Sequence, residues 1–171
     1  MGVDVAAVRA DTPGALEVAH LDNAGSSLPP RPVVEAVVDH LRLEARVGGY
    51  EAAERAEGAL EGFYTGVAAL VGARPEEIGF VESATRAWEL AFGSVVFSEG
   101  DRVLTTASEY PSNALGMVKA AGERGVRVEV VPDDAFGVMD VGALERELDR
   151  GGVRVVAVNH MPTHNGLVNP V

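Results

Sequence analysis

The residues best suited to chemistry lie in three segments where an apolar run gives way to small and polar residues. In the first, residues 82–88 read Glu-Ser-Ala-Thr-Arg-Ala-Trp and lead from a predicted strand into a predicted helix. Free N–H groups and the positive dipole end of a helix's first turn bind phosphate, and Thr85 can add a hydroxyl donor. Ser83 or Thr85 can equally do no more than cap the helix. The local pattern leaves a phosphate site and a plain helix cap as alternatives.

The second segment, residues 108–113, reads Ser-Glu-Tyr-Pro-Ser-Asn, breaks a predicted strand and starts another helix. Ser112 is a residue type that favours the N-cap position. Tyr110, at the end of a strand, can stack on a flat cofactor ring or can be a half-buried packing residue. The residue types alone do not separate these two roles.

The third segment, residues 159–166, contains two histidines four residues apart, His160 and His164. Pro162 and Gly166 argue against a single helical face that would present both imidazoles to one ion, and no acid-rich segment accompanies them. We therefore expect no metal site here and interpret His160 as a hydrogen-bonded structural histidine.

A regular alternation of short apolar runs and longer amphipathic runs places these segments at strand ends. Strands are predicted over 78–81, 102–106, 127–131 and 153–158, and helices over 85–97, 113–123 and 141–148. Such βαβ units form a parallel sheet, and the nearly all-apolar strands indicate that helices cover both of its faces. The predicted fold class is α/β with a mostly parallel sheet, in which ligands bind at the carboxyl ends of the strands.

The N-terminal part of the chain has a different pattern. Residues 1–20 are predicted to form an extended lead-in, followed by turn-forming residues at 22–27. One helix is predicted from Pro32 to the glycine pair at 48–49 and a second over 52–71, each with one apolar stripe for burial. We therefore expect two parts, residues 1–75 and residues 76–171.

Composition narrows the classes of function. The 171 residues carry a net charge of −12, from 26 acidic and 14 basic residues, which disfavours binding to nucleic acid. No stretch approaches the roughly 20 apolar residues of a membrane span, and the start of the chain does not have the pattern of a signal peptide. With no cysteine, the chain contains no disulfide and no thiolate metal site. The expectation is a cytoplasmic protein that binds neither nucleic acid nor membranes.

Five short motifs run along the chain: residues 21–25 (Leu-Asp-Asn-Ala-Gly), 48–52 (Gly-Gly-Tyr-Glu-Ala), 84–88 (Ala-Thr-Arg-Ala-Trp), 109–113 (Glu-Tyr-Pro-Ser-Asn) and 166–170 (Gly-Leu-Val-Asn-Pro). In this order and spacing they resemble the class V aminotransferase-fold enzymes of fold type I. The nearest branch is that of the isopenicillin-N-epimerase-like and ergothioneine C–S-lyase-like members, with the cysteine desulfurases as cousins. The resemblance implies an incomplete fold-type-I large domain, pyridoxal 5′-phosphate (PLP) as cofactor and a small amino-acid-like substrate.

The resemblance also implies cofactor-binding residues. Ala84 and Thr85 match the turn that holds the PLP phosphate, and Tyr110 matches the residue that covers the pyridine ring. Thr163 lies where desulfurases have an asparagine near the phenolic oxygen of the ring, which is a departure from their pattern. A nucleotide-binding domain is the weakest alternative, because no glycine-rich fingerprint is present.

For the substrate, the resemblance implies a pocket lined by Asn23, Ala24 and Gly25, which Tyr50 approaches. Residues 1–75 would then form the N-terminal segment and helices of the substrate side, and residues 76–171 part of the PLP-binding domain. The complete enzyme would be a homodimer.

PLP chemistry needs a lysine that forms a Schiff base with the cofactor and a carboxylate that keeps the ring nitrogen protonated. In the family both groups lie downstream of the matched segment, and Lys119 is the only lysine among the 171 residues. Lys119 lies opposite the apolar stripe of its predicted helix, so we expect a solvated side chain and not the Schiff-base lysine. No catalytic residue is therefore assigned.

The sequence thus predicts the N-terminal, cofactor-binding part of a PLP-dependent lyase, epimerase or aminotransferase that is inactive alone. The chain stops at residue 171, soon after a predicted core strand, which favours a piece of a longer protein. The alternative is a non-catalytic α/β interaction module that pairs with a full-length relative.

Overall fold

The computed structural model describes residues 2–23, 25–163 and 165–171 and divides the chain into two compact units. The first unit is Met1–Phe80 and the second is Val81–Val171. None of the described helices is long and apolar enough to cross a membrane. The assignment of the two parts to the substrate side and the cofactor side of an enzyme stays a prediction.

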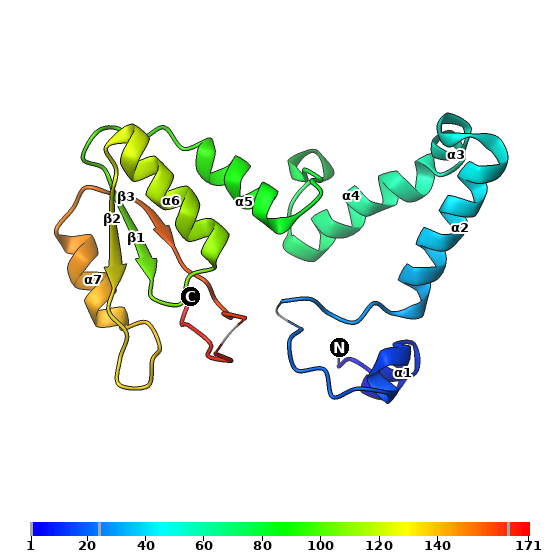
Figure 1. Ribbon diagram of the computed structural model, residues 1–171, viewed down its shortest axis with the longest axis horizontal. Coiled ribbons are helices and arrows are strands. Elements are labelled where there is room, and N and C mark those ends of the chain that lie inside the picture. Colours follow the sequence, from blue (N-terminus) through cyan, green and yellow to red (C-terminus); the bar gives the residue numbers. More distant parts are fainter. Residues whose placement is uncertain (1, 24, 164) are drawn as a thin grey trace. The chain divides into compact units, whose positions relative to one another are not determined.

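The second unit is a three-stranded parallel sheet with helices between its strands (Figure 1). Its elements are α5 (Ala84–Gly93), β1 (Arg102–Thr106), α6 (Pro111–Arg124), β2 (Arg127–Val131), α7 (Val141–Asp149) and β3 (Val153–Ala157). Strand β1 pairs in parallel with both other strands, so the order is β2-β1-β3. The predicted α/β fold class is confirmed, and the carboxyl ends of the three strands share one edge of the sheet.

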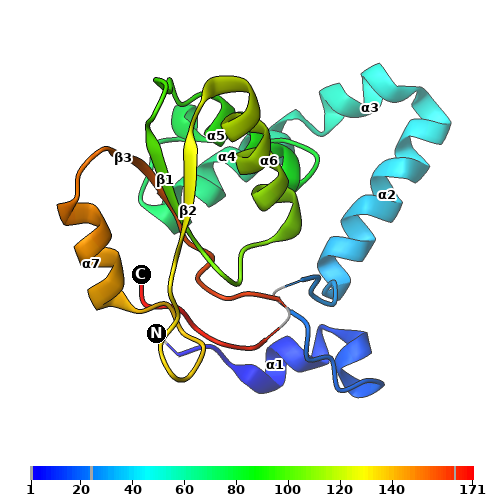
Figure 2. The same ribbon diagram turned by 60° about the vertical axis from the view of Figure 1, so that its left-hand side comes forward.

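Strand β1 is buried over its whole length because helices pack on both of its faces (Figure 2). On one face Val103 packs with Phe92 of α5 and Met117 of α6. On the other face Leu104 packs with Ala143 of α7. Successive strand residues point to opposite faces, so Val103 and Leu104, which are adjacent in β1, serve the two layers.

A buried ion-pair network holds the sheet at the end opposite the carboxyl edge. Arg102, the first residue of β1, has only 3% of its surface exposed. Its guanidinium donates to the carboxylates of Glu129 on β2 and Glu147 on α7 and to the carbonyl of Gly151. Hydrogen bonding to Glu129 raises the pKa of Arg102 above its usual range, and the same contact lowers the pKa of Glu129. The pairing makes burial of the charge tolerable and ties a helix to two strands.

The first unit is helical. It contains α1 (Val5–Ala10), α2 (Arg31–Val47), α3 (Gly49–Arg55) and α4 (Glu57–Val71), with 3-10 turns at Pro13–Leu16 and Pro75–Glu77. The prediction of an extended lead-in over 1–20 is wrong, because the Asp4 carboxylate caps α1 by accepting two backbone N–H bonds. The prediction of one helix over 52–71 is also wrong, because the backbone leaves the helical conformation at Ala56 and α4 starts afresh.

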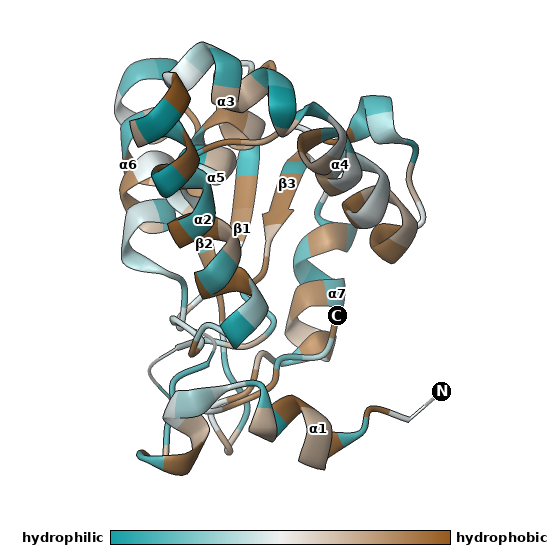
Figure 3. Cartoon of the chain, turned by 90° about the vertical axis from the view of Figure 1, so that its right-hand side faces the viewer, coloured by the Kyte–Doolittle hydropathy of each residue, from teal (hydrophilic) through white to brown (hydrophobic). Residues whose placement is uncertain are grey.

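Helices α2 and α4 carry apolar stripes that are largely exposed, and the apolar bands of α2 are visible in Figure 3. Val37 and Leu41 of α2 are 57% and 58% exposed, and Leu60 of α4 is 55% exposed. The prediction that these stripes are buried is wrong, because contacts within this unit, such as that of Phe63 with Phe80, leave most of each stripe uncovered. Its buried apolar residues are Ala52 and Ala68.

The predicted strand over 78–81 is not a strand in the structure. Ile78 has an extended backbone, but its N–H donates to the carbonyl of Pro75, and no described strand pairs with residues 78–81. An apolar run without a neighbouring strand has no ladder to join, so it remains a connecting segment. The helix that follows begins at Ala84 and ends at Gly93, four residues earlier than predicted.

Candidate cofactor-binding site

The start of α5 shows which of the two candidate residues, Ser83 or Thr85, caps the helix. Ser83 is the N-cap, and its hydroxyl accepts the N–H of Arg86 at 3.2 Å. Thr85 is therefore not the cap but the second residue of the helix, and it is half-buried. The N–H groups of Ala84 and Thr85 have no hydrogen-bond acceptor among the described residues, as is usual for a first turn. Ser83 caps the helix and Thr85 is available to bind a phosphate, so the two predicted roles belong to different residues and are compatible.

A second helix start meets the first at this point. The hydroxyl oxygens of Thr85 and Ser112 lie 3.2 Å apart and join α5 to α6 across 27 residues of sequence. The prediction that Ser112 is the N-cap is wrong, because the cap is Tyr110 and Pro111 is the first helical residue. Proline suits that position through its fixed φ and missing N–H. Ser112 is thereby released from capping and pairs with Thr85.

The carboxylate of Glu109 fixes the loop between β1 and α6. One of its oxygens accepts the N–H of Tyr110 at 2.7 Å and the side-chain amide of Asn113 at 3.0 Å. Its other oxygen accepts the hydroxyl of Thr105, in β1, at 3.3 Å. Sequence reasoning assigned no role to Glu109 or Asn113, although an acid just after a strand with an amide four residues later was a visible signal.

Tyr110 stands at the N-cap of α6 with 44% of its surface exposed. Its side chain makes no hydrogen bond and no ring contact with the described residues. The ring is therefore open to a flat ligand from outside, and its predicted role over the pyridine ring stays a prediction.

The loop after β3, which carries Thr163, is held by Asn169. The side chain of Asn169, 1% exposed, accepts the N–H of Met139 at 3.0 Å and donates to the carbonyl of Asn159 at 2.7 Å. Its own N–H donates to the carbonyl of His160 at 2.8 Å. These bonds close the loop around the half-buried Thr163, whose role beside the cofactor stays a prediction.

The histidine pair falls partly outside the structure's description. His164 lies outside the described residues. The backbone carbonyl of His160 accepts the N–H of Asn169. Among the residues that the structure describes, no three histidines and carboxylates gather as they would around a metal ion.

The predicted substrate residues belong to the N-terminal unit. Asn23 lines a pocket of about 440 Å³ formed by the segment around α1, and Tyr50 is not among its lining residues. The N–H of Gly25 donates to the carboxylate of Asp22 at 3.0 Å in a local turn. Tyr50, in the first turn of α3, is 94% exposed, and Ala24 lies outside the described residues. The role of these four residues toward a substrate stays a prediction.

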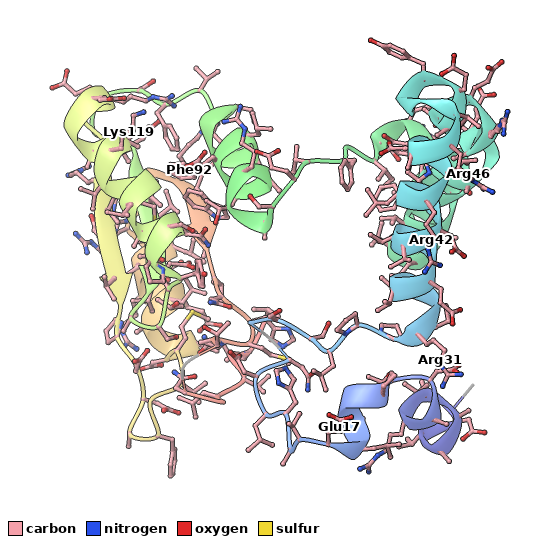
Figure 4. All side chains as sticks on the ribbon, turned by 45° about the vertical axis from the view of Figure 1, so that its right-hand side comes forward. Glu17, Arg31, Arg42, Arg46, Phe92 and Lys119 are labelled. Atoms are coloured by element: carbon pink, nitrogen blue, oxygen red, sulfur yellow. The ribbon has the colours of Figure 1, made fainter. Side chains whose placement is uncertain are left out.

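Lys119 lies on α6, seven residues after Ser112, or about 10 Å of helix rise beyond it (Figure 4). Its side chain is exposed and lines a groove of about 280 Å³ between α5 and α6 together with Trp88 and Phe92. The lysine is thus displaced along the helix from the hydroxyl pair at its start.

With this geometry in view, the comparisons with known proteins give the family. The family model described as Aminotransferase class-V matches residues 19–171. The chain belongs to the class V aminotransferase family. The predicted family is confirmed, and PLP is the cofactor on which this family depends.

Cysteine desulfurases are among the curated relatives of this chain. A probable cysteine desulfurase of Pyrococcus abyssi is 32% identical over 169 residues, which cover 96% of this chain and 42% of the relative. A probable cysteine desulfurase of Aeropyrum pernix is 36% identical over 160 residues, covering 90% of this chain and 39% of the relative. The chain thus spans less than half the length of the curated relatives that it matches.

Solved structures share the fold. The apo cysteine desulfurase of Thermococcus onnurineus NA1 superimposes with a TM-score of 0.81 at 30% identity, over 99% of this chain and 43% of that protein. A C-DES mutant with glycine covalently linked to its PLP cofactor has a TM-score of 0.82 at 19% identity, which shows likeness of fold alone.

The residues at the start of α5 and α6 fit a phosphate group. The donor set comprises the N–H groups of Ala84, Thr85 and Ser112, which have no acceptor among the described residues, and the hydroxyl pair. N–H groups and hydroxyls at the positive ends of two helices are the donors that a phosphate dianion prefers. The chemistry of this donor set therefore agrees with the cofactor of the family.

Proposed function

We propose that this chain forms the N-terminal, cofactor-binding part of a PLP-dependent enzyme that acts on a small amino-acid-like substrate. The observation that carries the proposal is the meeting of α5 and α6 at the hydroxyls of Thr85 and Ser112, with free N–H groups beside them. The family membership of residues 19–171 supports PLP as the ligand.

In this proposal each residue has a distinct task. The N–H groups of Ala84 and Thr85 and the hydroxyl of Thr85 hold the phosphate, and the exposed ring of Tyr110 covers the pyridine ring. Thr163 lies beside the phenolic oxygen, held in its loop by Asn169. When bound, PLP supplies an electron-withdrawing ring that acidifies the bonds at the α-carbon of an amino acid.

The reaction type proposed first is cysteine desulfuration, because the relatives that are 32% and 36% identical are named probable cysteine desulfurases. Other lyase, epimerase or aminotransferase reactions remain within the proposal, since Thr163 departs from the asparagine of the desulfurase pattern. We propose that Asn23, Ala24, Gly25 and Tyr50 line the substrate pocket, that the complete enzyme is a cytoplasmic homodimer, and that residues 1–75 and 76–171 are its two parts.

We further propose that the 171 residues alone do not turn over substrate. Lys119 is their only lysine, and it is exposed on α6 about 10 Å of helix rise beyond Ser112. Sulfide release from cysteine should therefore be at the buffer rate when the chain is incubated with PLP. Turnover that persists in Lys119→Ala would contradict this part of the proposal.

Ligand-dependent stabilisation tests the cofactor site. Pyridoxamine 5′-phosphate should raise the unfolding temperature of the chain more than pyridoxamine does, because ligands that bind the folded state stabilise it and only the first carries a phosphate. Trp88, the single tryptophan, reports unfolding by fluorescence. Thr85→Val should reduce the difference, because only the backbone N–H donors remain, and Thr65→Val, whose hydroxyl bonds only within α4, should keep it in full. Equal stabilisation by the two ligands would exclude the phosphate site.

A second candidate function is a non-catalytic interaction module that pairs with a full-length relative. The exposed apolar stripes of α2 and α4 favour it, because such surfaces commonly mark contacts between proteins. Light scattering of the chain alone and mixed with the Thermococcus onnurineus desulfurase would reveal a mixed complex. A monomer in both measurements counts against this candidate.

A further inference from the structure

The hydroxyls of Thr85 and Ser112 form an isolated pair. Their oxygens lie 3.2 Å apart, and neither hydroxyl has another hydrogen-bond partner among the described residues. Both residues occupy the second position of their helices, α5 and α6. Each hydroxyl has one proton and can both donate and accept. The contact uses one proton, so the pair keeps one hydroxyl proton for a further acceptor.

The pair lies at the positive dipole ends of two helices. There the N–H groups of Ala84, Thr85 and Ser112 lack acceptors within the described chain. The nearby carboxylate of Glu109 is already bonded to the Tyr110 N–H, the Asn113 amide and the Thr105 hydroxyl. The remaining hydroxyl proton therefore has an anion from outside as its natural acceptor.

We infer that Ser112 is a positioning residue that donates to the oxygen of Thr85 and so aims the Thr85 proton at the cofactor's phosphate. This rests on the proposed PLP site and adds to it a residue that acts through Thr85. A hydroxyl that accepts a hydrogen bond becomes a better donor, because bonds in a chain polarise one another. The contact also restricts the rotation of the Thr85 side chain, which lowers the entropy lost on binding.

A double-mutant cycle tests the inference. Pyridoxamine 5′-phosphate and pyridoxamine, neither of which carries an aldehyde that can react with Lys119, are titrated into the 171-residue chain by calorimetry. The expected loss of affinity for the phosphate ligand is about 5-fold in Ser112→Ala and about 30-fold in Thr85→Val. Affinity for pyridoxamine should change in neither variant. In the Thr85→Val background, Ser112→Ala should cause no further loss, because its effect passes through Thr85.

Two further variants separate positioning from general structural support. Ser112→Thr keeps a hydroxyl and should restore most of the affinity. Ser94→Ala removes a hydroxyl that bonds to Ala91 at the other end of α5, and it should leave ligand affinity unchanged. Unfolding followed by Trp88 fluorescence verifies that each variant is folded before it is titrated.

The outcomes test the positioning role of Ser112 separately from the proposed PLP site. Wild-type affinity in Ser112→Ala, or a loss that is equal with and without Thr85, overturns the positioning role while leaving the PLP site intact. A wild-type chain that binds pyridoxamine 5′-phosphate no better than pyridoxamine overturns the proposed function itself. Loss in Ser112→Ala that vanishes in the Thr85→Val background supports both.

Discussion

Leu104 in the α/β unit and Leu41 in the N-terminal unit each belong to an apolar pattern in the sequence, yet Leu104 is fully buried and Leu41 is 58% exposed. Leu104 lies in a central strand between two helical layers, so any apolar residue there finds neighbours on its own face. Leu41 lies on a helix whose apolar stripe meets no described element of its unit. The difference shows that amphipathic periodicity predicts a helix but not what covers it.

The same contrast extends to the energetics of the two units. The α/β unit buries two clusters, built around Val103 and Leu104, whereas the buried apolar residues of the N-terminal unit are Ala52 and Ala68. Helices of the length of α2 and α4 are marginal in water without tertiary packing. We therefore expect the α/β unit to hold most of the chain's stability and the N-terminal helices to gain theirs from a surface that covers their stripes.

The largest expected effect on the free energy of unfolding comes from replacing the buried leucine and not the exposed one. Leu104→Ala should lower the free energy of unfolding of the α/β unit by about 3 kcal/mol, because it leaves a cavity in a packed core. Leu41→Ala should change it by less than about 0.5 kcal/mol, because a half-exposed stripe loses little. Urea titration followed by Trp88 fluorescence measures both. Similar losses in the two variants would show that α2 is covered after all.

The next largest effect concerns a polar anchor of the α/β unit. Asn169→Ala should lower the free energy of unfolding by about 2 kcal/mol, because it leaves the Met139 N–H and the Asn159 carbonyl unpaired in a buried place. Asn165→Ala, in the same loop, removes one exposed bond to the Leu167 N–H and should cost less than about 1 kcal/mol. Amide hydrogen exchange of the loop should accelerate only in the first variant.

A smaller effect is expected where two helices of the α/β unit approach closely. A methyl group at Gly116 would lie 2.6 Å from the ring of Trp88, so Gly116→Ala should cost about 1 kcal/mol and shift the tryptophan emission. Gly122→Ala, on the same helix with open space around it, should instead stabilise by about 0.5–1 kcal/mol through helix propensity. If both glycines tolerate alanine, α5 and α6 do not pack as closely as the structure places them.

The contrast also explains how much of the fold the sequence predicts. The strands at 102–106 and 127–131 form with the predicted bounds, because apolar runs between glycine-rich turns and amphipathic helices leave little choice of structure. The run at 78–81 is also rich in apolar residues, but no described strand pairs with it and it forms no strand. An apolar run in the sequence thus predicts a strand only where a neighbouring strand is available to pair with it.

For the candidate site, the sequence predicts which residue types are present but not which of them contact one another. Thr85 stands out from its place after a predicted strand, whereas the contact with Ser112 joins helices that start 27 residues apart. Serine is a common N-cap residue, so the sequence predicts a cap at Ser112, whereas Pro111 is the first helical residue and leaves the Ser112 hydroxyl to pair with Thr85. The buried role of Arg102 was hidden as well, since its two carboxylate partners lie on β2 and α7.

The smallest effect is a change in how steeply the free energy of unfolding depends on pH, and it is confined to the acid range. The contact with Arg102 lowers the pKa of Glu129 below its ordinary value of 4.5, so the folded chain binds fewer protons than the unfolded chain in that range. The stabilisation is therefore complete above pH 4.5 and is lost as the pH falls through the lowered pKa, while Arg102 stays charged throughout.

Measured by urea titration between pH 3 and 6 (roughly the range that brackets carboxylate titration), the free energy of unfolding should decline less steeply with acidity in Glu129→Gln than in wild type. Glu145→Gln removes an exposed carboxylate on α7 that has no ion pair among the described residues, and it should keep the wild-type slope. An unchanged slope in Glu129→Gln would mean that the charge of Glu129 is not held by Arg102, and the difference between a cross-linked α/β unit and an unanchored N-terminal unit would then rest on apolar packing alone.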